Sequence, residues 1–164
     1  MKEIYHRVSI RKYTDEPVKE EDILQILKAA MQAPSTANQQ PWEFYVVTDK
    51  AVIRALSETS RNAACAAGAP VVIVTAYRTD VRLPEWAQID LSIAMENMWL
   101  QTDALGLGGV WLGIAPSQPR MEAVQKIIGM PEHVKAFGLF ALGYPAEEKE
   151  QQDRWNEERV HWVK

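Results

Sequence analysis

Residues 34–42 form an uncharged polar segment, Pro-Ser-Thr-Ala-Asn-Gln-Gln-Pro-Trp, between two regions with clear secondary-structure patterns. Its polar side chains are two hydroxyls and three carboxamides, which form hydrogen bonds without carrying a charge. Pro34 and Pro41 stiffen the two ends, because proline fixes its own φ angle and restricts the residue before it. Such a segment suits a flat, polar, neutral ligand that is bound by many weak hydrogen bonds.

A second candidate binding segment lies near the N-terminus. Residues 1–13 carry four basic side chains and one acidic side chain, a net charge of +3 in a protein whose net charge is −4. Residues 8–13 read as extended chain, in which alternate side chains share a face, so Arg7, Ser9 and Arg11 point one way. Two guanidinium groups and a hydroxyl match a phosphate, to which arginine donates bidentate hydrogen bonds. A half-buried strand with a solvated basic face explains the same pattern equally well.

Composition restricts the class of protein. The 164 residues, of which 47% are hydrophobic and 24% charged, predict a single globular domain over residues 1–164. The net negative charge argues against a nucleic-acid partner, and no apolar run approaches the roughly 20 residues that span a bilayer. One cysteine, Cys65, excludes an internal disulfide and favours a reducing compartment, the cytoplasm. Its alanine-rich surroundings favour a small buried apolar role over that of a nucleophile.

The motifs of side-chain catalysis are absent. The chain has no HExxH, CxxC, Walker A or GxSxG motif, and its three histidines have no metal-ligand spacing, so we predict no metal site. The glycine run at 106, 108 and 109 contains the first two glycines of a dinucleotide fingerprint but not the third. It precedes a strand instead of following one, so it indicates a helix cap and a turn. An enzyme with this sequence would therefore need a cofactor to supply its chemistry.

Hydrophobic periodicity predicts the elements that must position these segments. The predicted helices cover residues 2–7, 19–31, 50–58, 61–67, 86–105 and 119–128, and the predicted strands cover residues 43–48, 71–77, 109–114 and 136–143. The helix over 86–105 is apolar almost all round, so it should be buried on every side, in the domain centre or in a subunit interface. The charged tail 147–164 ends in Val-His-Trp-Val, which should pack onto something, and a homodimer fits both features.

Taken together, these segments resemble the FMN-dependent nitroreductase family. The resemblance rests on residues 7–13 and 34–42, on Asn62 ahead of the strand at 70–74, on the glycine-rich residues 104–113, and on Leu-Gly-Tyr-Pro at 142–145 before a charged tail. It spans the whole chain in the family's order, and the first two segments are its most specific part. The resemblance implies an α+β fold of three αβα layers, with a mixed central sheet flanked by helices, in an intertwined homodimer.

The resemblance also implies an FMN site at the subunit interface. Arg7 and Ser9 would hold the ribityl phosphate, with Val8 contributing backbone. Arg11 would lie at the N1/C2 carbonyl edge of the flavin, where a cation stabilises the negative charge of the reduced ring. The remaining residues that the resemblance assigns to FMN are Pro34, Ser35, Thr36, Asn38 and Gln40 from the other subunit, Asn62 at the pyrimidine edge, Leu112 and the backbone N–H near Gly113 beside N5, and Lys149 and Arg154 as candidates that complete the phosphate site.

The implied function is an FMN-dependent oxidoreductase that uses NADH or NADPH. The nicotinamide would deliver hydride to flavin N5 and leave, and a small acceptor such as a nitroaromatic or a quinone would follow in a ping-pong scheme. No catalytic side chain is required, which fits the missing motifs. Reductive dehalogenation, oxidative breakdown of the flavin, a flavin-binding sensor without turnover, and a binding module for a small phosphorylated ligand remain alternatives.

Overall fold

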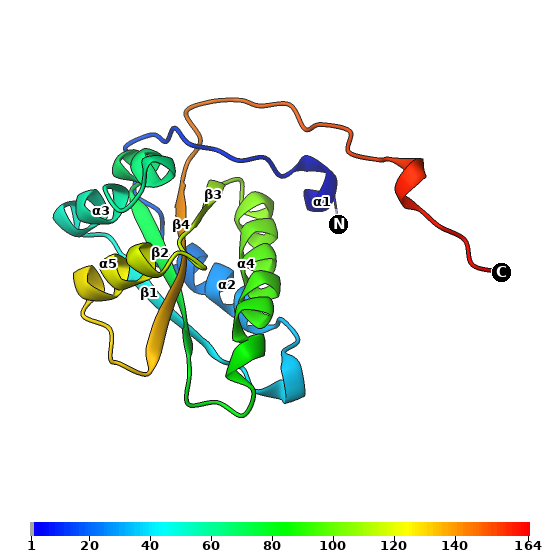
Figure 1. Ribbon diagram of the computed structural model, residues 1–164. Coiled ribbons are helices and arrows are strands. Elements are labelled where there is room, and N and C mark those ends of the chain that lie inside the picture. The colour runs from blue at the N-terminus through cyan, green and yellow to red at the C-terminus, as the bar shows by residue number, and fades with distance from the viewer. Residues whose placement is uncertain (1) are drawn as a thin grey trace.

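The computed structural model describes residues 2–164, and a single antiparallel sheet forms its centre (Figure 1). The strands follow the spatial order β1-β2-β4-β3, and each neighbouring pair is antiparallel. Their bounds are β1 Trp42–Val47, β2 Val71–Arg78, β3 Gly108–Gly113 and β4 Val134–Gly143. The expected mixed sheet therefore needs a correction. Within the described chain, parallel pairing is confined to a single bridge between Ser9 and Gly109, because the N-terminal segment lies along the outer edge of β3.

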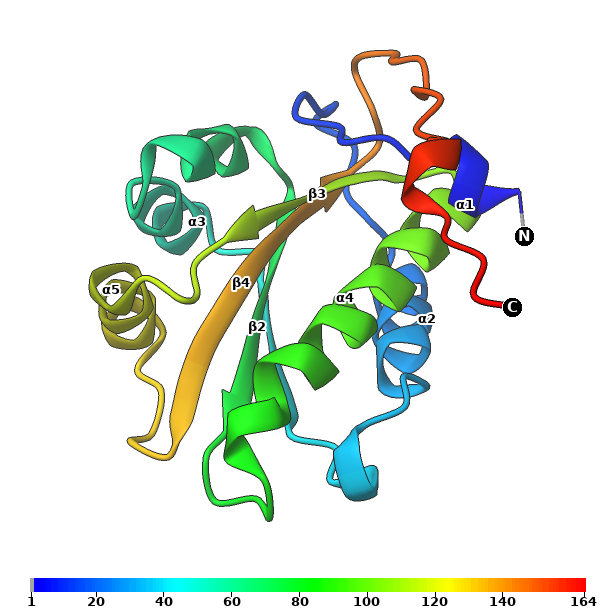
Figure 2. The same cartoon turned by 45° about the vertical axis from the view of Figure 1, so that its right-hand side comes forward.

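Helices cover both faces of the sheet, as expected for a three-layer α+β fold (Figure 2). One layer holds α2 (Glu20–Met31) and α4 (Ala87–Ala104). The opposite layer holds α3 (Lys50–Ser57), the 3₁₀ helix η2 (Arg61–Gly68) and α5 (Gln118–Ile128). The short elements are α1 (Glu3–His6), η1 (Thr36–Asn38), η3 (Pro84–Trp86) and η4 (Glu157–Arg159).

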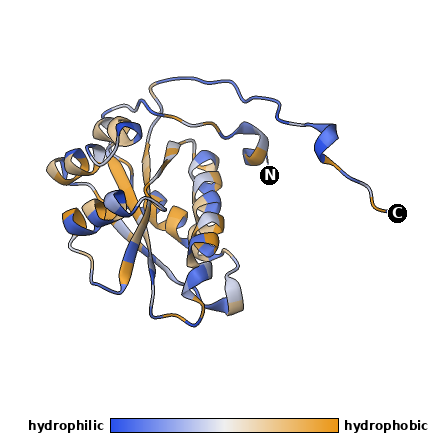
Figure 3. Cartoon of the chain, viewed as in Figure 1, coloured by the Kyte–Doolittle hydropathy of each residue, from blue (hydrophilic) through white to orange (hydrophobic). Residues whose placement is uncertain are grey.

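The hydrophobic pattern predicted these elements closely. Every predicted helix and strand is present with its ends shifted by a few residues, and the alanine-rich stretch after residue 60 is a 3₁₀ helix. Strand β2 is buried along residues 71–77, because both faces of the central sheet are covered there. Figure 3 shows the resulting concentration of hydrophobic residues on the strands and on α2, whose Ile23, Ile26 and Ala30 are buried.

Glycines explain how the N-terminal segment reaches the sheet. Gly106 has φ of +74° and ends α4, as a C-cap glycine does. Gly108 begins β3, and a Cβ atom there would lie 2.7 Å from the Ile10 side chain. The glycine run is therefore more than the predicted cap and turn, because the absent side chain of Gly108 leaves room for Ile10 beside β3.

Helix α4 departs from the expectation of burial on every side. Ala94, Met95 and Met98 are fully buried against the sheet and α2, whereas Ile89 is 53% exposed and Ile93 is 38% exposed. The sheet and α2 cover only part of the helix circumference, so within one chain a strip of apolar side chains remains open. We expected this helix to be buried either in the domain centre or in a subunit interface. The domain centre buries only part of its apolar surface.

The C-terminal tail leaves the body of the molecule after β4 (Figure 1). It is extended apart from η4, and Trp155 and Trp162 are 72% and 82% exposed. Within the described residues, the expected packing of Val160–Val163 onto another surface does not occur in a single chain. No helix among residues 2–164 combines the length and hydropathy needed to cross a membrane.

Candidate functional site

A hollow of about 530 Å³ opens between η2, the end of β3 and the N-terminal segment. Four of the residues assigned by resemblance meet there, although they are spread over more than 100 positions of the chain. The lining residues are Arg11, Arg61, Asn62, Cys65, Trp111, Leu112 and Gly113. Long-range assembly of Arg11, Asn62, Leu112 and Gly113 makes this hollow the candidate site for a flat polar ligand.

Gly113 leaves the backbone of β3 accessible at this hollow. It is exposed, its φ angle is not in the left-handed region, and a Cβ atom built on it would meet nothing within 4 Å. Neither the backbone conformation nor internal packing therefore requires glycine at this position. Glycine weakens a strand, and an uncompensated one often marks a place where a ligand approaches the backbone.

The hollow is positively charged, because two arginines line it and no acidic residue does. Burial raises the pKa of the Cys65 thiol, while nearby Arg11 and Lys149 act in the opposite direction. The thiol therefore stays protonated at neutral pH and adds no negative charge. Cys65 is half-buried and lies on the wall of the hollow, so the predicted buried apolar role is only partly correct.

Arg7 is held by two contacts with α4. Its guanidinium carbon lies 4.0 Å from the centroid of the Trp99 ring, and its Nε lies 3.5 Å from a carboxylate oxygen of Glu96. Nε is buried and donates no hydrogen bond to any of residues 2–164. The cation–π contact fixes the plane of the guanidinium. The guanidinium group of Arg7 is therefore held in one orientation, and its Nε–H still lacks a hydrogen-bond acceptor. Both properties are expected of a side chain that binds an anion.

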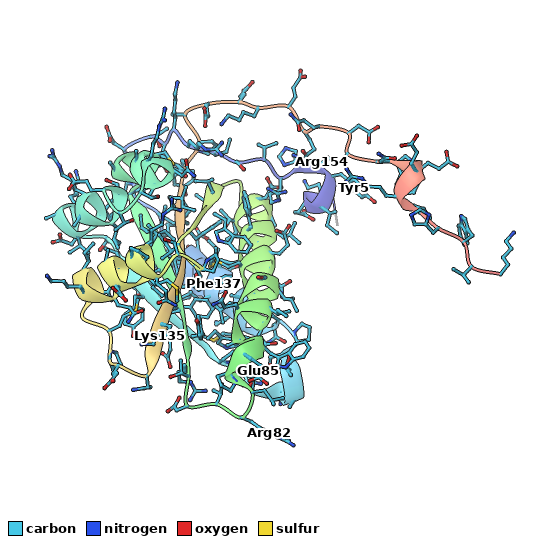
Figure 4. All side chains as sticks on the ribbon, viewed as in Figure 1. Tyr5, Arg82, Glu85, Lys135, Phe137 and Arg154 are labelled. Carbon is cyan, nitrogen blue, oxygen red and sulfur yellow. The ribbon has the colours of Figure 1, made fainter. Side chains whose placement is uncertain are left out.

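The first residues of the tail lie beside Arg7 and Ser9. Lys149 Nζ donates to the Ser9 carbonyl at 2.9 Å, and the Gln151 amide donates to the Arg7 carbonyl. Arg154 then donates to the Gln151 side chain, and Figure 4 labels it above the N-terminal segment. The structure therefore brings Lys149 to the backbone of Ser9, whereas Arg154 reaches Arg7 only through Gln151. Val8 lines a second hollow of about 370 Å³ together with His6, Ile10 and Lys149.

Glu147 clamps the tail to the N-terminal segment. One of its carboxylate oxygens accepts hydrogen bonds from the backbone N–H of Arg11 at 2.6 Å and of Lys12 at 3.2 Å. Lys149 Nζ lies 2.9 Å from the same oxygen. The hydrogen bond from Lys149, followed by that from the Arg11 N–H, holds the pKa of Glu147 below its ordinary value.

The loop over residues 34–42 has an unusual backbone. Ala37, Asn38 and Gln40 all have positive φ angles, of 51°, 52° and 46°. Each non-glycine residue in this region costs about 1 kcal/mol or more, so the loop needs compensating interactions. The Ser35 hydroxyl accepts from the Gln40 N–H at 2.9 Å, and the Gln40 side chain donates to Asn38 at 3.0 Å. These bonds fold the loop tightly and leave Pro34, Asn38 and Gln40 exposed.

Asp90 on α4 anchors this loop. Its carboxylate is 1% exposed and accepts from the Thr36 N–H at 2.8 Å, the Thr36 hydroxyl at 3.1 Å and the Gln39 amide at 2.7 Å. Gln39 also exchanges two hydrogen bonds with the backbone of Leu83. The side chains of Thr36 and Gln39 therefore already form hydrogen bonds within the chain. The side chains better placed to bind a ligand are those of Ser35, Asn38 and Gln40.

The loop and the N-terminal segment lie at opposite ends of α4 (Figure 1). Asp90 holds the loop at one end, and Trp99 holds Arg7 nine residues later, which is roughly 14 Å along a helix. The structure thus brings Arg11, Asn62, Leu112 and Gly113 together, and Arg7 and Ser9 with Lys149 and Arg154. It does not bring either group to Pro34, Ser35, Thr36, Asn38 or Gln40 of the same chain.

Sequence reasoning missed several residues of this arrangement. Arg61 and Trp111 line the hollow, Glu96 and Trp99 hold Arg7, and Asp90 and Glu147 anchor the two binding segments. One signal was available: Asp90 is an isolated charge in an otherwise apolar stretch of helix, and a buried carboxylate needs several donors. The contacts of Glu96 and Glu147 had no signal, because charged residues on helices and tails are ordinarily solvated.

A profile of the Nitroreductase family matches residues 4–64 and 59–144. The chain belongs to the Nitroreductase family. A protein of Archaeoglobus fulgidus, provisionally named an NADH dehydrogenase or NAD(P)H nitroreductase, is 42% identical to this chain and aligns with 98% of it and 95% of its own length.

Solved structures of nitroreductases have the same fold. An FMN-dependent nitroreductase of Clostridium difficile superposes with a TM-score of 0.92 at 29% identity, covering 99% of this chain and 98% of its own. A provisionally named nitroreductase of Desulfovibrio desulfuricans, solved in complex with FMN, gives a TM-score of 0.85 at 29% identity, covering 99% and 95%.

Replacing Asp90 by asparagine should destabilise this protein, although the two side chains have nearly the same shape. The new amide N–H₂ would face either the Thr36 donors or the Gln39 amide, so at least one buried donor loses its acceptor. We expect the free energy of unfolding to fall by about 1–3 kcal/mol in urea titrations. Asp15→Asn, at an exposed residue, is the control and should change it by less than about 0.5 kcal/mol. Equal stability of the two variants would contradict the anchoring role.

The Glu147 clamp should open only in acid. Because the pKa of Glu147 is lower in the folded protein than its ordinary 4.5, its contribution is complete above pH 4.5 and is lost as pH falls through the folded value. We expect the amide protons of residues 11 and 12 to lose exchange protection below about pH 4.5, after correction for intrinsic rates. Glu147→Gln should weaken their protection at every pH, whereas Glu148→Gln, at an exposed neighbour, should not. A pH-independent profile in the unaltered protein would exclude the clamp.

Proposed function

We propose that this protein is an FMN-dependent oxidoreductase that takes electrons from NADH or NADPH and passes them to a small acceptor of the nitroaromatic or quinone type. The observation that carries the proposal is the hollow in which Arg11, Asn62, Leu112 and Gly113 meet. The family, the FMN-dependent structure from C. difficile and the FMN complex from D. desulfuricans support the same cofactor.

The residues of the hollow fit a flavin ring. Gly113 offers exposed backbone with no Cβ atom, so a flat ring can approach β3 closely. Asn62 carries both a donor and an acceptor, which suits the alternating carbonyl and N–H groups of a pyrimidine edge. Arg11 supplies a cation whose side chain is exposed and forms no ion pair with described residues.

The residues around Arg7 fit the phosphate group of FMN. An extended chain rises about 3.3 Å per residue, so residues 7 and 11 lie roughly 13 Å apart along the N-terminal segment. A ligand that binds Arg11 with its ring can therefore place a phosphate near Arg7 and Ser9. Arg7 has an unsatisfied buried Nε there, and Lys149 lies against the Ser9 carbonyl. Glu96 lies 3.5 Å from this Nε but accepts no hydrogen bond from it, and an anionic ligand would supply the acceptor that the described residues do not.

The other half of the site would come from a second copy of the chain. No residue of the loop over residues 34–42 lines the hollow of its own chain, yet the exposed amides of the loop suit the same ligand. The open strip of α4 at Ile89 and Ile93 and the protruding tail provide apolar surface for a homodimer. In this arrangement the loop of one protomer would complete the hollow of its partner.

In this proposal, bound FMN supplies hydride acceptance and donation, and the chain supplies binding and electrostatics. Arg11 places positive charge at the pyrimidine edge, where electron density rises on reduction, and so favours the reduced cofactor. Arg7 holds the phosphate in a fixed orientation set by Trp99 and Glu96. Leu112 and Trp111 form apolar walls that limit water around the reacting face.

The purified protein should bind FMN and lose its yellow colour when NADH or NADPH is added without oxygen. Arg7→Ala should weaken FMN binding about 10- to 100-fold, because one charged hydrogen-bonding group to the phosphate is worth roughly 1.5–3 kcal/mol. Fluorescence titration of FMN measures this change. Lys12→Ala, which removes an exposed basic side chain from the same segment, should leave the affinity nearly unchanged. Colourless protein that takes up no added FMN would refute the proposed function.

Ile93→Glu should produce a monomer that no longer retains FMN. The substitution places a charge on the open strip of α4 but not in the core of its own chain, so the fold should persist. Sedimentation velocity reports the oligomeric state, circular dichroism the fold, and absorbance at the flavin band the bound cofactor. Ala51→Glu on α3 is the matched control on a surface away from α4. A folded monomer that keeps its FMN would show that one chain suffices.

A further inference from the structure

Arg61 is a second cation of the hollow, and the chain gives it no partner. It is exposed at the start of η2 and lines the hollow together with Arg11. Among residues 2–164 no carboxylate or carbonyl oxygen pairs with its guanidinium. Arg11 also lacks an ion pair with described residues, whereas Arg54 pairs with Glu58 at 3.6 Å and Arg78 with Glu43 at 3.8 Å.

The geometry of η2 separates Arg61 from the residues that would face the cofactor. In a 3₁₀ helix side chains three positions apart eclipse, so Asn62 and Cys65 point the same way and Arg61 is rotated by about 120°. Arg11 and Asn62 suffice for the pyrimidine edge in the proposed function. The guanidinium of Arg61 can therefore bind a ligand other than the flavin ring.

The surroundings of Arg61 indicate what this ligand would be. No acidic side chain lines the hollow, and the nearby carboxylate of Glu147 is paired with Lys149 at 2.9 Å. Trp111 lines the same hollow and packs against Phe137 with ring centroids 5.5 Å apart, which gives the cavity a fixed aromatic wall. Phe137 is labelled at the centre of the molecule in Figure 4. A cation beside an aromatic wall suits a planar molecule that carries a carboxylate or a phosphate.

We propose that Arg61 binds the anionic group of the aromatic molecule that enters the hollow above the cofactor. The inference rests on the proposed function and adds a ligand class to it: aromatic compounds bearing a carboxylate or phosphate. Two sources share this chemistry, an acidic acceptor and the phosphates of the nicotinamide donor. Arginine selects either one over a neutral analogue, because its planar fork donates two charge-assisted hydrogen bonds.

The test measures binding to oxidised, FMN-loaded protein by calorimetry, without turnover. The probes are benzoate, its neutral analogue benzyl alcohol, and NAD⁺. The variants are Arg61→Gln, Arg61→Lys and the control Arg54→Gln, which removes the same charge from an exposed site outside the hollow. FMN affinity of each variant is measured first, and each probe is then titrated at an FMN concentration that saturates that variant, so that a change in probe affinity is separated from a change in cofactor binding.

We expect Arg61→Gln to bind benzoate at least about tenfold more weakly, with Arg61→Lys in between, since lysine keeps the charge but not the bidentate geometry. Benzyl alcohol affinity should not change, and Arg54→Gln should behave like the unaltered protein. Weaker benzoate binding identifies an acidic acceptor, and weaker NAD⁺ binding identifies the donor phosphates. Benzoate affinity in the unaltered protein should also fall with added salt.

Two results would overturn the inference. One is an Arg61→Gln variant that binds benzoate and NAD⁺ as tightly as the unaltered protein does. The other is an unaltered protein that binds neither probe. Both leave the proposed function standing if the protein still binds FMN and is reduced by NADH or NADPH. Failure to bind FMN refutes the proposed function instead, and the same titrations on FMN-free protein still show whether Arg61 recognises the anion.

Discussion

The hydrogen bonds from residues 36 and 39 to the buried carboxylate of Asp90 determine where half of the candidate site lies. A buried carboxylate is costly unless several donors surround it, and Thr36 and Gln39 supply three. In return, the carboxylate holds a loop in which Ala37, Asn38 and Gln40 have left-handed backbone conformations. Neither partner would be stable alone, because the loop is strained and the carboxylate would lack donors. Their pairing fixes the exposed amides of the loop at the N-terminal end of α4.

Helix α4 links the pairing of Asp90 with the loop to the way in which two chains would assemble. The helix is rigid, and it carries the loop anchor at Asp90 and the Arg7 support at Glu96 and Trp99. Bending it to bring the two together would break its packing against the sheet, where Met95 and Met98 are fully buried. The two binding segments are therefore held apart within one chain, which supports the proposal that the second segment of a complete site belongs to another chain. The same helix presents Ile89 and Ile93 to solvent, so the surface that would join two chains lies between the two half-sites.

The sequence predicted the elements of the fold well, because hydrophobic periodicity reports burial directly. Strand β2 and helix α2 are examples in which local pattern and final environment agree. Residues 34–42 also stood out, since a stiff, uncharged loop is unusual. The sequence could not show that Arg7 packs on Trp99, or that Glu147 bonds the N–H groups of Arg11 and Lys12, because those contacts join positions 92 or more residues apart. The parallel bridge at Ser9 is missed for the same reason: it depends on the room left by Gly108, which only the folded chain reveals.

The charge distribution determines which ligands the candidate site favours. The protein is acidic overall, with a net charge of −4, yet the hollow is lined by Arg11 and Arg61 and by no acidic residue. Cys65 preserves this contrast, because burial raises the pKa of its thiol and keeps it neutral at physiological pH. A positive hollow in a negative surface focuses the field on its opening and raises the local concentration of small anions. The arrangement therefore favours a small molecule with one or two negative charges, which matches both a nucleotide cofactor and an acidic aromatic ligand.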